Sequence, residues 1–255
     1  MTTSDRLLAI LGLFSSERTA LSVEEVSLEL NLSISTVYRY FRSLSKAGFV
    51  EAFVPGRYVL GPAITHLDRL IRIADPFITS ASPVMREIFE QLPPSTVVLL
   101  CRLYKEQVMC VHQEVRGPPV RRVSYERGRA LPIFRGSPSK VILAHLPPRR
   151  SQRLYLAQRA SGDFTEIQWR ELKRQLREIR QTGVATSEGE VDSGAVGISV
   201  PLFDVAGGAA GSLSVVLDAA QATQQLRNYA CEVLKAKGRL IQQRILDMAH
   251  QAVTT

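Results

Sequence analysis

Apolar residues recur at three- and four-residue intervals in three stretches near the start of the chain, a spacing that predicts three short amphipathic helices. The apolar positions of these helices are Leu7, Ile10, Leu11 and Phe14; then Val23, Val26 and Leu30; then Ile34, Val37, Phe41 and Leu44. The second helix opens at Ser22 with an S-x-x-E capping pattern, and the third stops at Gly48, a residue suited to the end of a helix. Only residues 31–33 separate these two helices, which is typical of a helix-turn-helix.

Two β-prone runs, at residues 49–53 and 58–61, follow the third helix. The turn between them contains Pro55 and Gly56, so the pattern predicts a β-hairpin. A β-hairpin directly after the third helix is the wing of a winged helix-turn-helix. We therefore predict a winged helix-turn-helix domain over residues 1–61.

The side of the third helix that faces away from its apolar stripe is polar and basic. Its residues are Ser35, Thr36, Tyr38, Arg39, Arg42 and Lys46. No acidic residue occurs between Asn31 and Val50, as expected for a helix that lies in the major groove between phosphates. With Ser22 and Ser33 at helix starts and Arg57 in the wing, these residues are the predicted contacts with double-stranded DNA. The alternative is a winged helix that binds another protein.

A linker helix is predicted over residues 62–76, where Asp75 and Pro76 end it. Its apolar residues fall on one side and are Ile64, Leu67, Leu70, Ile71 and Ala74. Such a stripe needs a partner. A second copy of the chain would place two recognition helices on paired half-sites, but packing against the helix's own domain fits the pattern equally well.

Residues 77–255 alternate between helical and strand-like patterns. The predicted helices cover residues 77–92, 137–146, 148–159, 165–182 and 220–249, and the predicted strands cover residues 96–104, 107–115, 195–202 and 212–217. This order favours one antiparallel or mixed sheet covered by helices, so the predicted fold class is α+β.

The chain has 255 residues and a formal net charge of +8, which fits two domains and a polyanionic partner. Residues 1–73 hold eight basic and seven acidic residues, so nearly all the excess lies in the second domain and cannot identify the DNA-binding surface. No transmembrane run or secretory signal is visible, and we expect a cytoplasmic protein without membrane contact. The spacing of the three cysteines and four histidines predicts neither a metal site nor a disulfide framework, and no cofactor is expected.

The run from Ser137 to Lys140 predicts a helix start, with Ser137 as the N-cap and Pro138 as the first helical residue. Free backbone N–H groups and the positive end of the helix dipole make such a start a receptor for a carboxylate. The approach to it is basic, with Arg116, Arg121, Arg122, Arg127, Arg129 and Arg135. We expect an anionic effector here, bound by Arg129, Arg135 and the residues from Ser137 to Ser139. The alternative is an ordinary capped helix beside a solvated basic loop.

Several segments resemble the IclR family of bacterial transcription regulators in their order and spacing. They are Ser33–Arg39 in the recognition helix, Gly56–Gly61 in the wing, Gly136–Ala144, and Gly183–Glu190 followed by Gly194–Pro201. The resemblance covers nearly the whole chain. One position departs from it, because Ser139 stands where the family usually has Gly before the lysine.

The resemblance implies a winged helix-turn-helix, a linker helix used in dimerisation and a C-terminal α/β (GAF/PAS-like) effector-binding domain, residues 77–255, with a mostly antiparallel sheet. Such proteins bind palindromic operators near catabolic genes as dimers or dimers of dimers. They respond to small organic or aromatic acids. The family contains both repressors and activators, and we expect this protein to be a repressor. By position in the family's late motif, Ser187, Gly197, Ser199 and Ser214 belong to the effector pocket. Val216 stands where a second serine is usual, which indicates a less polar pocket.

An enzyme with an accessory winged helix is the main alternative. The run Gly197–Pro201 lacks the closing glycine of a nucleophile elbow, and Gly207–Gly211 lacks the G-K-[ST] of a P-loop. We therefore expect no catalysis. A C-terminal protein-interaction module beside a vestigial winged helix is the second alternative.

Overall fold

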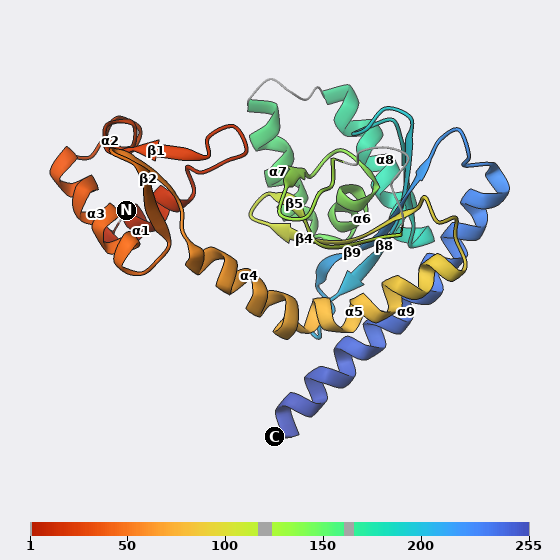
Figure 1. Ribbon diagram of the computed structural model, residues 1–255. Coiled ribbons are helices and arrows are strands. Elements are labelled where there is room, and N and C mark those ends of the chain that lie inside the picture. The colour runs from red at the N-terminus through yellow and green to blue at the C-terminus, as the bar shows by residue number, and fades with distance from the viewer. Residues whose placement is uncertain (1, 117–123, 161–165, 255) are drawn as a thin grey trace. The chain divides into compact units, whose positions relative to one another are not determined.

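The computed structural model describes residues 2–116, 124–160 and 166–254 (Figure 1). The chain divides into two compact units, residues 1–75 and residues 76–255, and each has its own hydrophobic core. Among the described residues, no helix has both the length and the apolar character that crossing a bilayer requires.

Residues 1–75 form a winged helix-turn-helix followed by a further helix. The elements are α1 (Thr3–Leu11), β1 (Ala20–Ser22), α2 (Val23–Leu30), α3 (Ile34–Lys46), β2 (Val50–Val54), β3 (Arg57–Leu60) and α4 (Pro62–Ala74). The three strands pair antiparallel in the order β1-β3-β2. This confirms the predicted fold of the unit. Strand β1 was not predicted, because three residues are too short for a recognisable alternation.

The predicted capping box at the start of α2 is present. The Ser22 hydroxyl accepts a hydrogen bond from the Glu25 N–H at 3.2 Å, and the Glu25 carboxylate accepts one from the Ser22 N–H at 2.8 Å. Asn31 then adopts a left-handed conformation, with φ of 51°, which ends α2 and turns the chain into α3.

The core of this unit forms where α2 and α3 pack on the small sheet. Phe41 is fully buried, and its ring stacks on Tyr58 of β3 with 4.1 Å between the ring centroids. The predicted stripe of α3 is wrong at one residue: Ile34 is 49% exposed, while Tyr40 is buried. Ile34 lies in the first turn of α3, where the helix extends beyond the buried part of its stripe.

Residues 76–255 form a six-stranded sheet covered by helices. The elements are α5 (Pro76–Glu87), a 3-10 turn η1 (Ile88–Glu90), β4 (Val97–Tyr104), β5 (Gln107–Val115), β6 (Ala130–Pro132), α6 (Ser137–His145), α7 (Pro148–Ala160), α8 (Glu166–Thr182), β7 (Ala185–Glu188), β8 (Ala195–Phe203), β9 (Ala209–Asp218) and α9 (Gln224–Thr254). Neighbouring strands are antiparallel in the order β6-β5-β4-β9-β8-β7, which confirms the mostly antiparallel sheet.

Helices cover both faces of this sheet, and successive strand residues point to opposite faces (Figure 1). On one face, α5 and α9 pack against residues such as Ile198 and Leu213. On the other face lie α6, α7 and α8. Gly197, Ser199 and Ser214 alternate with the apolar residues of the first face, so they face α6.

Candidate DNA interface and effector site

The outward face of α3 presents most of the residues predicted to bind DNA. Ser33 is the N-cap, and its hydroxyl accepts a hydrogen bond from the N–H of the half-buried Thr36 at 3.3 Å. The exposed side chains of this face are Ser35, Tyr38, Arg39, Arg42 and Lys46. The helix therefore gathers hydroxyl groups at its start and cations along its length.

Arg39 and Arg42 carry much of the charge of this face. α3 contains no acidic residue, and neither guanidinium forms an ion pair with any residue that the structure describes. The Arg39 guanidinium lies over the ring of Tyr40, 5.8 Å from its centroid. Both cations are thus exposed and open to a polyanion.

Ser22 and Arg57, the predicted flanking contacts, are both bound to Glu25. The Ser22 hydroxyl is part of the capping box, and the Arg57 guanidinium donates to the Glu25 carboxylate at 2.7 Å. The hydrogen bond from the Ser22 N–H, and then the one from Arg57, lower the pKa of the Glu25 carboxyl. These contacts join the start of α2 to the strand that follows the wing turn.

The start of α6 differs from the predicted one in its cap. The N-cap is Gly136, with φ of 79°, and Ser137 is the first helical residue, so the prediction that Ser137 caps the helix and Pro138 begins it is wrong by one position. A Cβ at Gly136 would lie 2.9 Å from the Tyr125 hydroxyl and 3.0 Å from Val191. That crowding and the positive φ together require glycine.

A carboxylate of the chain itself lies at the start of α6. The Glu190 carboxylate accepts a hydrogen bond from the Gly136 N–H at 3.0 Å and a second from the Lys140 ammonium. Lys140 is 8% exposed, and its ammonium also donates to the side-chain oxygen of Gln175 at 3.2 Å. The helix start therefore holds the kind of group that its N–H donors and dipole favour.

The predicted pocket serines meet beside this carboxylate. Ser187 pairs with Gly197 across β7 and β8, and Ser199 pairs with Ser214 across β8 and β9. The Ser187 hydroxyl accepts a hydrogen bond from the Ser137 N–H at 2.9 Å, and the Ser199 hydroxyl donates to the Ser137 hydroxyl at 2.8 Å. A Cβ at Gly197 would lie 2.5 Å from the Ser137 hydroxyl, so glycine lets α6 approach the sheet.

The cavity among these groups is small. Its volume is about 30 Å³, and its lining includes Pro138 and Val216. Behind it, the hydroxyl of buried Ser139 lies 2.9 Å from the Tyr125 hydroxyl, which donates to the Arg135 carbonyl at 3.1 Å. Burial raises the pKa of the Tyr125 phenol, so this group stays protonated. A space of this size holds about one or two water molecules and excludes an organic acid.

The arginines of the predicted basic approach are not gathered at this cavity. Arg129 and Arg135 are exposed and do not line it. The others are Arg116, which is exposed, Arg127, which donates to a carbonyl of β5 at 2.8 Å, and Arg121 and Arg122, which lie outside the described residues. Neither Arg129 nor Arg135 is among the residues that line the cavity, so their predicted part in effector binding has no support from this geometry.

Lys140 and Glu190 are the residues of the site that sequence reasoning missed, since it named them only as parts of motifs. A usable signal was present: Lys140 interrupts the apolar run of a buried helix, and a buried ammonium needs a carboxylate partner. Among the described residues, no group of His, Cys, Asp or Glu side chains is arranged to hold a metal ion.

Comparison with known proteins agrees with this architecture. The family model "IclR helix-turn-helix domain" matches residues 3–52, and the model "Bacterial transcriptional regulator IclR C-terminal" matches residues 74–243. The HTH-type transcriptional regulator KipR of Bacillus subtilis (strain 168) is 25% identical over 89% of this chain and 90% of its own length.

Two solved structures share the fold. An IclR transcriptional regulator from Silicibacter sp. TM1040 has a TM-score of 0.82 and 23% identity and covers 96% of both chains. An IclR homolog from Microbacterium hydrocarbonoxydans, complexed with 4-hydroxybenzoate, has a TM-score of 0.76 and 20% identity, over 96% of this chain and 99% of its own. The chain belongs to the IclR family of bacterial transcriptional regulators, which are not enzymes, and combines a DNA-binding helix-turn-helix with a C-terminal effector domain.

Proposed function

We propose that this protein is a repressor that binds a palindromic operator as a dimer or dimer of dimers and responds to a small organic or aromatic acid. In this proposal residues 1–61 bind DNA, residues 62–76 join two copies, and residues 77–255 bind the acid. The observation that carries it is the carboxylate of Glu190 at the start of α6, beside a small serine-lined cavity.

The DNA contacts follow from the exposed face of α3. Ser33, Ser35, Thr36 and Tyr38 lie near its start, where recognition helices meet base edges, and the contacts that extend along it and around it are Arg39, Arg42, Lys46, Ser22 and Arg57. Arg57 would approach a phosphate while it remains close to Glu25, so we assign it a weaker contribution than Arg39 or Arg42.

Homo-oligomerisation is supported by the apolar stripe of α4. Leu67, Leu70 and Ile71 are 42%, 39% and 48% exposed, and no residue of α4 is buried. An apolar face of this kind on a helix next to a DNA-binding domain is well suited to a second copy of the chain, which would present two recognition helices to two half-sites.

The proposed effector site follows from the contacts of Glu190. Its carboxylate accepts hydrogen bonds from the Gly136 N–H and the Lys140 ammonium. These are the donors that an acid effector would need. The hydroxyl groups of Ser137, Ser187 and Ser199 lie beside it. The effector's carboxylate would therefore replace that of Glu190, and the segment that carries Glu190 would move to admit the rest of the molecule.

The acid class is supported by this donor set and by one structural neighbour, the Microbacterium protein whose structure contains 4-hydroxybenzoate. Val216 and Pro138 in the cavity lining would supply apolar contact for a ring or a short carbon chain. Ser214 and Ser139 lie deeper and would position the groups that line the site. Arg129 and Arg135 would reach the ligand only after the cavity opens.

Replacing Glu190 with Gln is expected to increase the affinity for 4-hydroxybenzoate by about tenfold. The amide keeps the size of the side chain but loses its ionic contact with Lys140, so less free energy is needed to displace it. Isothermal titration calorimetry measures the change. Glu188→Gln is the matched control, because Glu188 pairs with Arg227 at 2.6 Å and does not line the cavity. Unchanged or weaker binding by Glu190→Gln would refute the displacement step.

The whole proposal is tested by selecting an operator from a random duplex pool and measuring its binding by fluorescence polarisation. We expect affinity at least about a thousandfold above that for a scrambled duplex, and a steep fall with salt. Adding 4-hydroxybenzoate or a related acid should release the operator and raise the melting temperature of the protein. If a broad panel of such acids alters neither quantity, the effector assignment fails for that class.

A further inference from the structure

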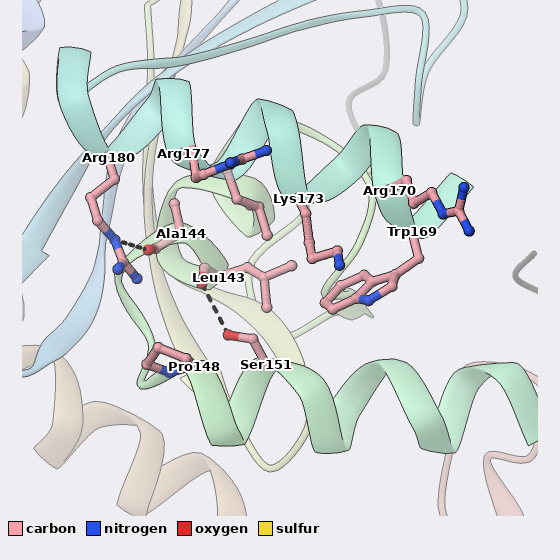
Figure 2. Close-up of a pocket in the computed structure, with 10 residues that line it drawn as sticks. Leu143, Ala144, Pro148, Ser151, Trp169, Arg170, Lys173, Arg177 and Arg180 are labelled. Atoms are coloured by element: carbon pink, nitrogen blue, oxygen red, sulfur yellow. Dashed lines mark hydrogen bonds between the residues drawn. The ribbon is translucent and has the colours of Figure 1, made fainter. Parts of the chain in front are cut away.

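A second cavity lies between α6, α7 and α8, at the opposite end of α6 from Glu190. Its volume is about 440 Å³, within the range of small-molecule sites. Figure 2 shows its lining, with α8 on one side, α7 on the other and residues of α6 at the back. None of its lining residues is Asp or Glu, whereas α8 alone supplies several cations.

The inner wall of this cavity is apolar. Leu143 and Ala144 of α6 are buried in it, and Trp169 of α8 is 7% exposed. The indole stacks on the ring of Tyr155 from α7, with 4.2 Å between centroids and an interplanar angle of 3°. A flat aromatic wall and two aliphatic side chains form a surface suited to the apolar body of a ligand.

Two cations of α8 line this cavity and have no carboxylate partner among the described residues. The Lys173 ammonium lies 5.6 Å from the centroid of the Trp169 ring, and Arg177 follows one turn later on the same face of α8 (Figure 2). Neither forms an ion pair with a residue that the structure describes. Arg180 is already engaged, because its guanidinium donates to the carbonyls of Ala144 at 2.7 Å and Leu146 at 3.3 Å.

We propose that this cavity is a second binding site, for a small carboxylate with an apolar ring. The ring would lie against Trp169 and Leu143, and the carboxylate would bind between Lys173 and Arg177. Charge complementarity supports an anion, and the stacked indole supports a ring. Because α6 runs from this cavity to the Glu190 site, a ligand here would contact the same helix as the effector.

The sole tryptophan of the chain is Trp169, so its fluorescence reports on this cavity directly. Cyclohexanecarboxylate is the probe, since it has a ring and a carboxylate but does not absorb where indole emits or is excited. We expect a saturable change in emission, as the carboxylate draws Lys173 away from the indole. The neutral cyclohexanecarboxamide has the same shape. It should change the emission only at concentrations at least about tenfold higher than those at which the carboxylate acts.

Substitutions in and outside the cavity test whether the change in Trp169 emission arises from binding here. Arg177→Gln and Lys173→Gln should each weaken the response by about tenfold in Kd. Arg174→Gln removes the same charge from the same helix but pairs with Glu171 outside the cavity, and it should match the wild type. Ser187→Ala, at the other site, should also match it. No saturable change in the wild type, equal responses from Arg177→Gln and the wild type, or loss of the response in Ser187→Ala would each overturn the proposal.

Discussion

The double variant Arg39→Ala, Arg42→Ala is expected to bind a selected operator at least about a hundredfold more weakly than the wild type. Each guanidinium is exposed on a face that has no acidic residue, so each is free to contact a base edge or a phosphate. Removing an Arg that contacts a base edge costs about 1–3 kcal/mol of binding free energy. Removing an Arg that contacts a phosphate reduces the salt dependence of binding. Fluorescence polarisation at several salt concentrations separates these two roles.

Arg6→Ala, which removes one positive charge outside α3, is the control for this variant. Arg6 is an exposed cation of the same unit, but it lies on α1 rather than α3. If Arg6→Ala weakened binding as much as the double variant, net charge rather than the face of α3 would account for the affinity. Wild-type affinity in the double variant would remove both arginines from the interface.

Replacing Phe41 with Ala is expected to destabilise the N-terminal unit by about 3–5 kcal/mol. Phe41 is fully buried between α3 and the sheet, and its ring stacks on Tyr58. A unit of 75 residues has a small core and a correspondingly small free energy of unfolding, so this loss removes most of its stability. The melting temperature of the N-terminal transition should fall by at least about 12 °C, measured by differential scanning calorimetry.

Tyr38→Ala provides the comparison on the same helix. Tyr38 is 49% exposed on the outward face, so its loss should change the stability by less than about 0.5 kcal/mol while it weakens operator binding. Phe41→Ala should instead lose DNA binding together with the folded unit. A Phe41→Ala protein that melts like the wild type would show that the core of the unit does not depend on this side chain.

Much of the N-terminal fold could be predicted because its determinants are local. The apolar spacing of α2 and α3, the Ser22 cap and the Pro55-Gly56 turn each fall within a few residues of the element that they define. The burial of Ile34 was predicted wrongly, because an apolar stripe on a helix does not reveal how far along the helix the neighbouring core extends. β6 and β7 escaped prediction for a related reason: they are short, and pairing with longer strands stabilises them.

The proposed effector site could be predicted from the sequence only in part. The prediction of Ser187 and Gly197 rests on a family resemblance rather than on any local pattern. Ser187 of β7 and Gly197 of β8 both adjoin Ser137 at the start of α6. The Gly136–Glu190 hydrogen bond joins residues 54 positions apart, and it depends on how β7 and the turn after it meet α6. The prediction of Arg129 and Arg135 rests on their nearness in sequence to Ser137, but neither residue lines the cavity.

Methylation of guanine N7 by dimethyl sulfate tests most directly whether the outward face of α3 lies in the major groove, since N7 is a major-groove atom. On an operator selected from random duplexes, we expect the wild-type protein to protect guanines in two half-sites, and the double variant of Arg39 and Arg42 to leave them reactive at the same occupancy. Guanines that stay as reactive in the wild-type complex as in free DNA would contradict the account.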